Sequence, residues 1–334
     1  MEGKRAFPML AGLIAGAVFV VAVSFLCKKE EYTLKLTFNP PRVYRQKAEA
    51  EISTMKLLEA GDSFIPVLAK YHEKMDINLY QYMEHKTGAK MLVQETSSNN
   101  IDNVTIIYDS ENVTDKYKDE FVSELPPPNY FFYRFSEDGK SERGFSSVEI
   151  RSMIETSFLI RTLPSRPVSK GNKWQTKSNF GAFRVVCEYE LKDVFLKEST
   201  LIGTISGHVD YYKNPVSDKL GTFDLEYNLD IKKGIIISSK GLYQFTALCN
   251  NTVYDYTETF ILNLESIEQI EEQESVAISS QLLLISQAYR ELYGNNISGF
   301  ISKLSEYLAA FPNSRFSAKI DKIRSYARER LEKK

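Results

Sequence analysis

The sequence predicts an α+β protein, with an N-terminal transmembrane helix, a curved antiparallel β-sheet domain against which one helix packs, and a small C-terminal helical layer. An uncharged run of 22 residues lies near the N-terminus. Alternating apolar and polar residues recur through its middle, and apolar stripes at helical spacing close it. We therefore expect a transmembrane signal anchor at 1–29, an antiparallel β-rich domain at 30–270 and a tail of three helices at 271–334.

The composition excludes several classes of protein. The 334 residues include 42 Lys and Arg against 44 Asp and Glu, and 43% of them are hydrophobic. A disordered tail, a collagen-like fibre and a polybasic nucleic-acid binder each need a skewed composition, so no nucleic-acid partner is expected. Three His and three Cys, far apart in the chain, argue against a structural zinc site, which takes four clustered ligands. We expect no metal and no cofactor.

The apolar run from Ala6 to Cys27 is long enough to cross the hydrocarbon core of a bilayer as a helix, which takes roughly 20 residues. A cleaved signal peptide has a shorter apolar core of about 7–15 residues, followed by small residues. Here bulky Phe25 and Leu26 precede Cys27, which also disfavours the alternative of a lipidated cysteine. The run therefore predicts an uncleaved anchor, with the membrane as a partner of residues 6–27.

The charges on either side of this run are nearly equal, since two basic residues precede it and two follow it. A short tail ahead of a first span usually stays inside the cell. We therefore expect residues 30–334 to be extracytoplasmic, where disulfides form. Two alternatives stay open for Cys187 and Cys249, the thiols of this body: a disulfide, or two buried free thiols on apolar strand faces.

Strands with one buried face are predicted along most of the middle part. Apolar and polar residues alternate there with a period of two, and the polar face of each strand indicates an antiparallel sheet. Lys232, Lys233 and Gly234 interrupt the alternation, so residues 221–249 are interpreted as a hairpin. The strands are expected at 32–38, 183–192, 223–231, 234–249 and 253–264.

Helical spacing of apolar residues is found in two places. Residues 147–160 predict a helix that packs on the sheet and ends before Pro164. The acidic stretch Glu265–Glu274 predicts either a polar connection into the tail or the solvated start of a helix. The tail helices are expected over 276–293, from Ile297 until Pro312 closes the helix, and from Phe316 to the end of the chain.

The segment from Leu163 to Trp174 resembles the Leu-Pro-x-x-Pro-Val-x-x-Gly-x-x-Trp signature of uncharacterised bacterial envelope proteins, many of them lipoproteins predicted to be β-rich. Shorter pieces extend the resemblance over residues 30–270. It implies a cell-envelope location, in the bacterial periplasm or at the cell surface, and no known activity. The chain departs from the family where a lipobox would stand.

The segment from Phe311 to Ser314 is similar to the boundary between helices in tetratricopeptide-like repeats of envelope proteins. A repeat array needs about three units to bury a continuous core, whereas residues 276–332 have room for fewer than two units of about 34 residues. The alternative is a helical cap packed on the β-rich domain.

Catalytic motifs occur only out of context. Ser53–Lys56 and Lys86–Gly88 match two motifs of penicillin-recognising enzymes, but alternating residues before the serine predict a strand where that fold needs the start of a helix. His72, His85 and His208 stand in no catalytic motif. No pair of carboxylates is singled out for glycoside hydrolysis. We therefore name no catalytic residue and expect the protein not to be an enzyme.

Four aromatic residues are candidates for a ligand or partner surface. Trp174 is the only tryptophan, and we expect it in the core, with ligand stacking as the alternative. Tyr130, Phe131 and Phe132 follow three prolines, and they form either an aromatic lip on an exposed loop or a strand with a stiff entry.

Two classes of function remain, and a third is kept. The first is a non-catalytic interaction or scaffold module of the bacterial cell envelope, whose helical tail contacts another envelope protein. The second is a carrier or sensor that holds an apolar or lipid ligand inside a half-barrel sheet closed by the helix at 147–160. A large apolar pocket beneath Trp174 would favour the carrier. Convergent titratable groups in that pocket would favour the third class, an envelope hydrolase.

Overall fold

The computed structural model describes residues 30–37, 42–60, 63–83, 90–123, 128–135, 141–145, 162–180, 183–213, 219–249 and 252–332. The membrane span predicted at 6–27 and the helix predicted at 147–160 lie outside these residues. Among the helices that are described, none is both long and apolar enough to cross a membrane.

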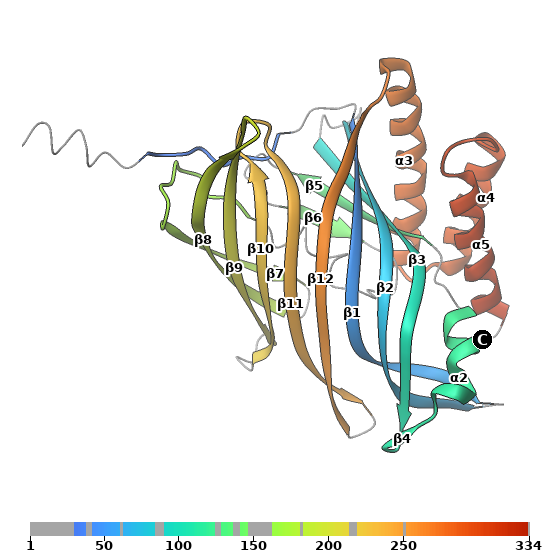
Figure 1. Cartoon of the computed structure of the whole chain (residues 1–334). Coiled ribbons are helices and arrows are strands. Elements are labelled where there is room, and N and C mark those ends of the chain that lie inside the picture. The colour runs from blue at the N-terminus through green and yellow to red at the C-terminus, as the bar shows by residue number, and fades with distance from the viewer. Residues whose placement is uncertain are drawn as a thin grey trace, which may run out of the picture.

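The described residues form twelve strands of one curved sheet, and every strand pairing in it is antiparallel (Figure 1). The strands are β1 (Arg42–Ala60), β2 (Ser63–Met83), β3 (Lys90–Tyr108), β4 (Glu111–Asn112), β5 (Asn129–Phe135), β6 (Ser141–Phe145), β7 (Lys173–Phe180), β8 (Phe183–Lys197), β9 (Thr200–Lys213), β10 (Lys219–Asp230), β11 (Ile235–Cys249) and β12 (Thr252–Gln269). Their order across the sheet is β6-β5-β3-β2-β1-β12-β11-β10-β9-β8-β7, with β4 paired to β3. The first long strand thus lies beside the last.

The predicted antiparallel sheet is confirmed. The alternating segments fall within β8, β10, β11 and β12, and the turn of the predicted hairpin contains Gly234 with a φ of 64°, which a residue without Cβ adopts readily. The segment predicted as a strand at 32–38 is different, because Tyr32 bridges Val168 in isolation. Leu34 and Leu36 are nevertheless buried, as the alternation indicates.

The larger hydrophobic core lies on the inner, concave face of the sheet. Every second residue of the strands points to this face, as Ala50 of β1, Tyr189 of β8 and Phe260 of β12 do. The helix α2 (Thr114–Ser123) adds Tyr117 and Phe121 to the same core. The sheet is therefore apolar on its inner face from β5 across to β8.

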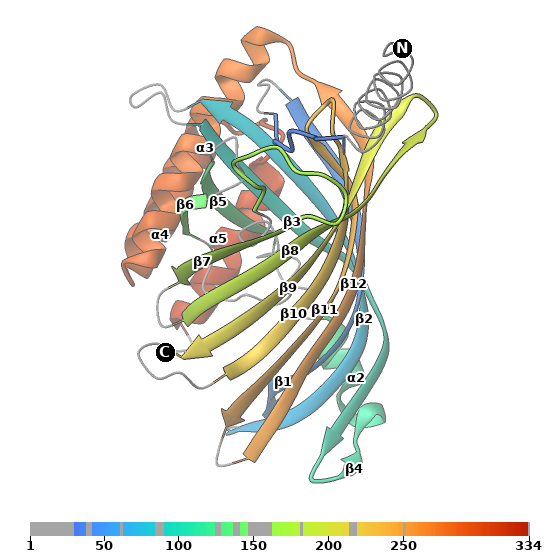
Figure 2. The same cartoon turned by 90° about the vertical axis from the view of Figure 1, so that its left-hand side faces the viewer.

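A second core lies on the outer face of β1, β2, β3 and β5, where a layer of three helices packs (Figures 1 and 2). The layer consists of α3 (Glu272–Tyr293), α4 (Ile297–Ala310) and α5 (Ser317–Glu332). The three helices agree with those predicted for the tail. The polar connection predicted at 265–274 is wrong in extent, because β12 continues to Gln269 and α3 begins at Glu272. No tetratricopeptide-like array is supported.

Charged contacts tie this helical layer to the sheet. Glu95 of β3 is 1% exposed, and its carboxylate accepts hydrogen bonds from Asn78 (2.8 Å), Tyr130 (2.7 Å) and Lys319 of α5. Burial, followed by the charge of Glu95, raises the pKa of Tyr130 well above its usual value, so the phenol remains a donor.

Candidate functional site

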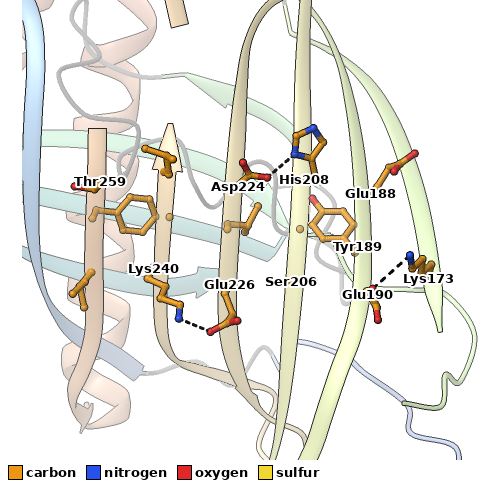
Figure 3. Close-up of a pocket in the computed structure, with 16 residues that line it drawn as sticks. Lys173, Glu188, Tyr189, Glu190, Ser206, His208, Asp224, Glu226, Lys240 and Thr259 are labelled. Carbon is orange, nitrogen blue, oxygen red and sulfur yellow. Dashed lines mark hydrogen bonds and ion pairs between the residues drawn. The ribbon is translucent and has the colours of Figure 1, made fainter. Parts of the chain in front are cut away.

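A groove of about 620 Å³ crosses the outer face of the sheet from β7 to β12 (Figure 3). Side chains alternate along a strand, so residues two apart flank the groove while the residue between them points to the inner face. The register of the strands lines these residues up across the sheet. One flanking row is Glu188, His208, Asp224, Leu242 and Thr259, and the other is Lys173, Glu190, Ser206, Glu226, Lys240 and Ile261.

The floor of the groove is the backbone of the row between these two, which includes Gly207 and Gly241. A Cβ on Gly207 would lie 2.8 Å from side-chain atoms of both Tyr189 and Leu225 on the inner face. A Cβ on Gly241 would likewise lie 2.8 Å from a ring atom of Phe260. The glycines therefore let large inner side chains lie directly beneath the floor.

The charged groups of the groove are paired with one another. Cations and carboxylates face each other on neighbouring strands, which is a stabilising cross-strand arrangement. The cross-strand pairs are Lys240 with Glu226 at 2.9 Å, His208 with Asp224 at 2.5 Å and Lys173 with Glu190 at 3.6 Å. Beside the groove, Lys192 of the same strand lies 2.9 Å from Glu190, and the Gln175 amide donates to Glu188 at 3.0 Å.

His208 is a titratable group of the groove whose pKa its neighbours change. The hydrogen bond from its Nδ1 to Asp224 raises the pKa of the imidazole, and Nε2 lies 3.3 Å from Asp210. Burial by itself would raise the pKa of Asp210, but Lys219 and His208 together hold that pKa below its usual value. The histidine thus acts as a cation between two carboxylates at acidic pH.

The described residues contain no group of three or more His, Cys, Asp or Glu side chains placed to hold a metal ion. Ser53–Lys56 belongs to β1, so the serine does not begin a helix. Lys86–Gly88 and His85 lie outside the residues that the structure describes. His72 lies on β2, where its Nδ1 is 2.8 Å from Asp102.

Trp174 packs on the inner core and does not face the groove. Its ring stacks on that of Tyr189 at 5.6 Å between centroids, and its Nε1 donates to the carbonyl oxygen of Thr162. The inner face also holds a cavity of about 30 Å³ between Leu36, Tyr44 and their neighbours. That volume has room for a water molecule but not for a lipid.

Of the two alternatives for Tyr130, Phe131 and Phe132, the structure has the strand and not the exposed aromatic lip. All three belong to β5 and are at most 2% exposed. Tyr130 and Phe132 pack under the helical layer, whereas Phe131 belongs to the inner core. The alternation seen in the other strands is missing here because β5 is buried on both faces.

The disulfide between Cys187 and Cys249, one of the two alternatives, is not formed. Cys187 is a free, buried thiol, and the strand register places it level with Tyr243 of β11. Cys249 is therefore three strand spacings away, about 14 Å, and six residues further along. A disulfide requires Cα atoms within about 7 Å of each other.

The groove was not predicted from the sequence. Its polar residues are visible as the solvent-facing half of each alternating strand, and Gly207 and Gly241 are mid-strand glycines of the kind that mark close packing. The order and register of the strands, which bring the two rows together, leave no local signal in the sequence.

Comparisons with known proteins are sparse. No family model matches the chain, and no curated protein matches it. Among solved structures, a chain described under lipid–protein interactions in lipovitellin is similar, with 16% sequence identity and a TM-score of 0.41. The match covers 70% of this chain and 26% of that chain, so this protein spans about a quarter of the lipovitellin chain. A TM-score of this size does not establish a common fold.

Proposed function

We propose that the protein is a non-catalytic interaction module, anchored in a membrane of the bacterial cell envelope by residues 6–27, and that the groove binds a polypeptide partner. The main observation behind this proposal is the groove on the outer face of β7–β12. The helices of the tail bury their apolar faces on the sheet. Among the described elements, no helix packs on the outer face of β7–β12, where the groove lies.

The chemistry of the groove suits an extended polypeptide. It presents both signs of charge together with aliphatic side chains, of which Ile261 is 57% exposed. A partner with interspersed charges can exchange ion pairs with Glu226 and Lys240 while covering Leu242 and Ile261. This combination supports a partner surface better than a site for a wholly apolar molecule.

A carrier of an apolar or lipid ligand is the second candidate. It is favoured by the continuous apolar lining of the inner face, from Phe131 of β5 to Tyr189 of β8. The cavity of about 30 Å³ that the described residues line on that face is itself too small for a lipid. An envelope hydrolase is not proposed, because no arrangement of the described residues favours it.

Native mass spectrometry of the full chain, extracted from the membranes of the producing cell, tests the proposal. Ser206→Trp would fill the groove, whereas Thr246→Trp adds the same ring to the outer face of β11 outside it. We expect one polypeptide to accompany both the parent chain and Thr246→Trp, and at least a tenfold loss of it with Ser206→Trp. Equal retention by both variants would contradict the groove. A lipid-sized mass without a polypeptide would support the carrier instead.

A further inference from the structure

The hairpin of β8 and β9 ends in apolar side chains that are exposed to solvent. Phe195 lies opposite Ile202, and Leu196 lies opposite Leu201. Phe195 is 39% exposed and Leu196 is 68% exposed. Leu201 is half-buried and Ile202 is buried, so the exposed pair Phe195 and Leu196 is called the hairpin tip below. Because Phe195 and Leu196 are adjacent on one strand, the tip presents apolar groups on both of its faces.

A tight two-residue turn closes the tip. Glu198 and Ser199 have φ values of 46° and 68°, the left-handed conformation that both central residues of a type I′ turn adopt. Such a turn matches the twist of its two strands. Figure 2 shows the hairpin projecting past its neighbours. The apolar tip is thus presented by paired strands and not by a loose loop.

The tip lies at the end of the sheet where the described chain begins. Tyr32 bridges Val168, and the loop that follows Val168 is joined to β8, where the Gly171 N–H donates to the carbonyl oxygen of Leu191 at 2.7 Å. The N–H of Thr37 donates to Gly234 in the turn between β10 and β11. Figure 2 shows the blue N-terminal segment at this same end.

The predicted membrane span ends close to this point. Its last residue, Cys27, precedes Glu30 by three residues, and an extended chain covers at most about 3.6 Å per residue. The end of the predicted span is therefore at most about 11 Å from Glu30 along an extended chain. By contrast Leu57, which is 60% exposed, lies near the end of β1 beside the turn into β2, at the opposite end of the sheet (Figure 1).

Three lysines lie at or beside the tip, and one of them, Lys233, pairs with Asp230 at 3.8 Å. Lys197 is next to Leu196, and Lys232 and Lys233 lie in the neighbouring turn between β10 and β11. All three lysines are exposed. Exposed Glu198 is the acidic residue of the turn itself. Apolar groups with lysines around them are the combination by which peripheral segments bind the interface of an anionic bilayer.

We propose that the hairpin tip inserts into the interface of the anionic membrane in which the chain is anchored. The membrane is then contacted twice, by the span and by the tip, and the β1–β2 hairpin points away from it. The inference rests on the anchorage in the proposed function but not on any partner in the groove.

The test uses the full chain in phosphatidylcholine vesicles, with and without phosphatidylglycerol, in which part of the lipid carries brominated acyl chains. Leu196→Trp places a fluorophore at the tip, and Leu57→Trp is the matched control at the other end. Trp174, the only native tryptophan, gives the background in the parent chain. We expect bromine to quench more than half of the emission added at position 196 and almost none of that added at position 57.

The charge of the membrane provides a second readout. Lys197→Glu together with Lys233→Glu should lower the quenching at position 196 with phosphatidylglycerol to the level seen without it. Equal quenching at 196 and 57 in vesicles that carry the chain would overturn the tip contact alone. Failure of the chain to float with the vesicles would overturn both the anchorage and the tip contact, while the groove is tested separately by the retained polypeptide.

Discussion

The two halves of the sheet share one inner face and differ on the outer one. At one end of β1, β2, β3 and β5 the outer side chains, such as Val43, Tyr80 and Val93, are apolar, and three helices cover them; further along β1 and β2 the outer side chains, such as Glu49 and Lys74, are charged and exposed. From β7 to β12 the outer side chains are charged and flank an open groove. A strand buried on both faces needs no polar residue, whereas a strand with one wet face must alternate. The strands covered by helices therefore support the structure, whereas the outer face of β7–β12 is available for binding.

The largest expected effect is the loss of stability when a contact between the helical layer and the outer face of the sheet is removed. Phe316 is fully buried and its ring lies 5.2 Å from that of Tyr80, so Phe316→Ala should lower the free energy of unfolding by about 3–5 kcal/mol. Leu331→Ala, at a site on α5 that is 45% exposed, should cost less than about 0.5 kcal/mol. Chemical denaturation measures both. Similar losses for the two variants would contradict the role assigned to the buried ring.

The carboxylate under the helices gives the next largest effect. Lys319→Met removes one donor from Glu95, which is buried, and should lower the free energy of unfolding by about 3 kcal/mol. Lys322→Met changes an exposed lysine on the same helix and should have almost no effect. If both variants were equally stable, the contact between Lys319 and Glu95 would not hold α5 on the sheet.

The floor of the groove can be tested from either side. Gly207→Val would press against Tyr189 and Leu225 and should cost about 1–3 kcal/mol of stability. Ser206→Val, one residue away, points into the groove and should be close to neutral. Thermal unfolding compares them. A neutral Gly207→Val would mean that the inner side chains do not lie against this strand.

The smallest effect is the pH response of the groove. Asp224 raises the folded-state pKa of His208, so the pair stabilises the fold below the unfolded-state value of about 6.5, and this contribution is lost as the pH rises through the folded-state pKa. Since His208 is 44% exposed, the contribution is about 0.2–1 kcal/mol. In Asp224→Asn, NMR titration should find a lower pKa for His208. An unchanged pKa would exclude the ion pair in solution.

The sequence predicts the open half of the sheet better than the covered half. Alternation in β8 and β10 reports one wet face directly, and the helices of the tail follow from their apolar stripes and from the breaks at Gly294 and Pro312. In β5 the run Tyr130–Tyr133 is apolar on both faces, so no period distinguishes it from an aromatic loop. The partner of its second face lies more than 150 residues away along the chain, in α3 and α5.

The site is harder to predict than the fold. Glu188, His208 and Asp224 are adjacent only through the pairing of three strands, and each alone looks like an ordinary solvent-facing residue. Ion pairs across strands depend on register, which is set by turns and bulges far from the site. The same reasoning applies to Cys187 and Cys249, whose separation is apparent only once the strand order is known.

The pairing of β1 with β12 has a consequence for how the chain folds. Arg42 lies opposite Gln269, so two meanders, each built from neighbouring strands, are joined by a contact between residues far apart in the sequence. Closing so long a loop is slow, and contacts of high sequence separation lower folding rates. During synthesis the edge of β1 that pairs with β12 therefore stays unpaired until β12 has been synthesised. Until then it is an open strand edge that can pair with other chains.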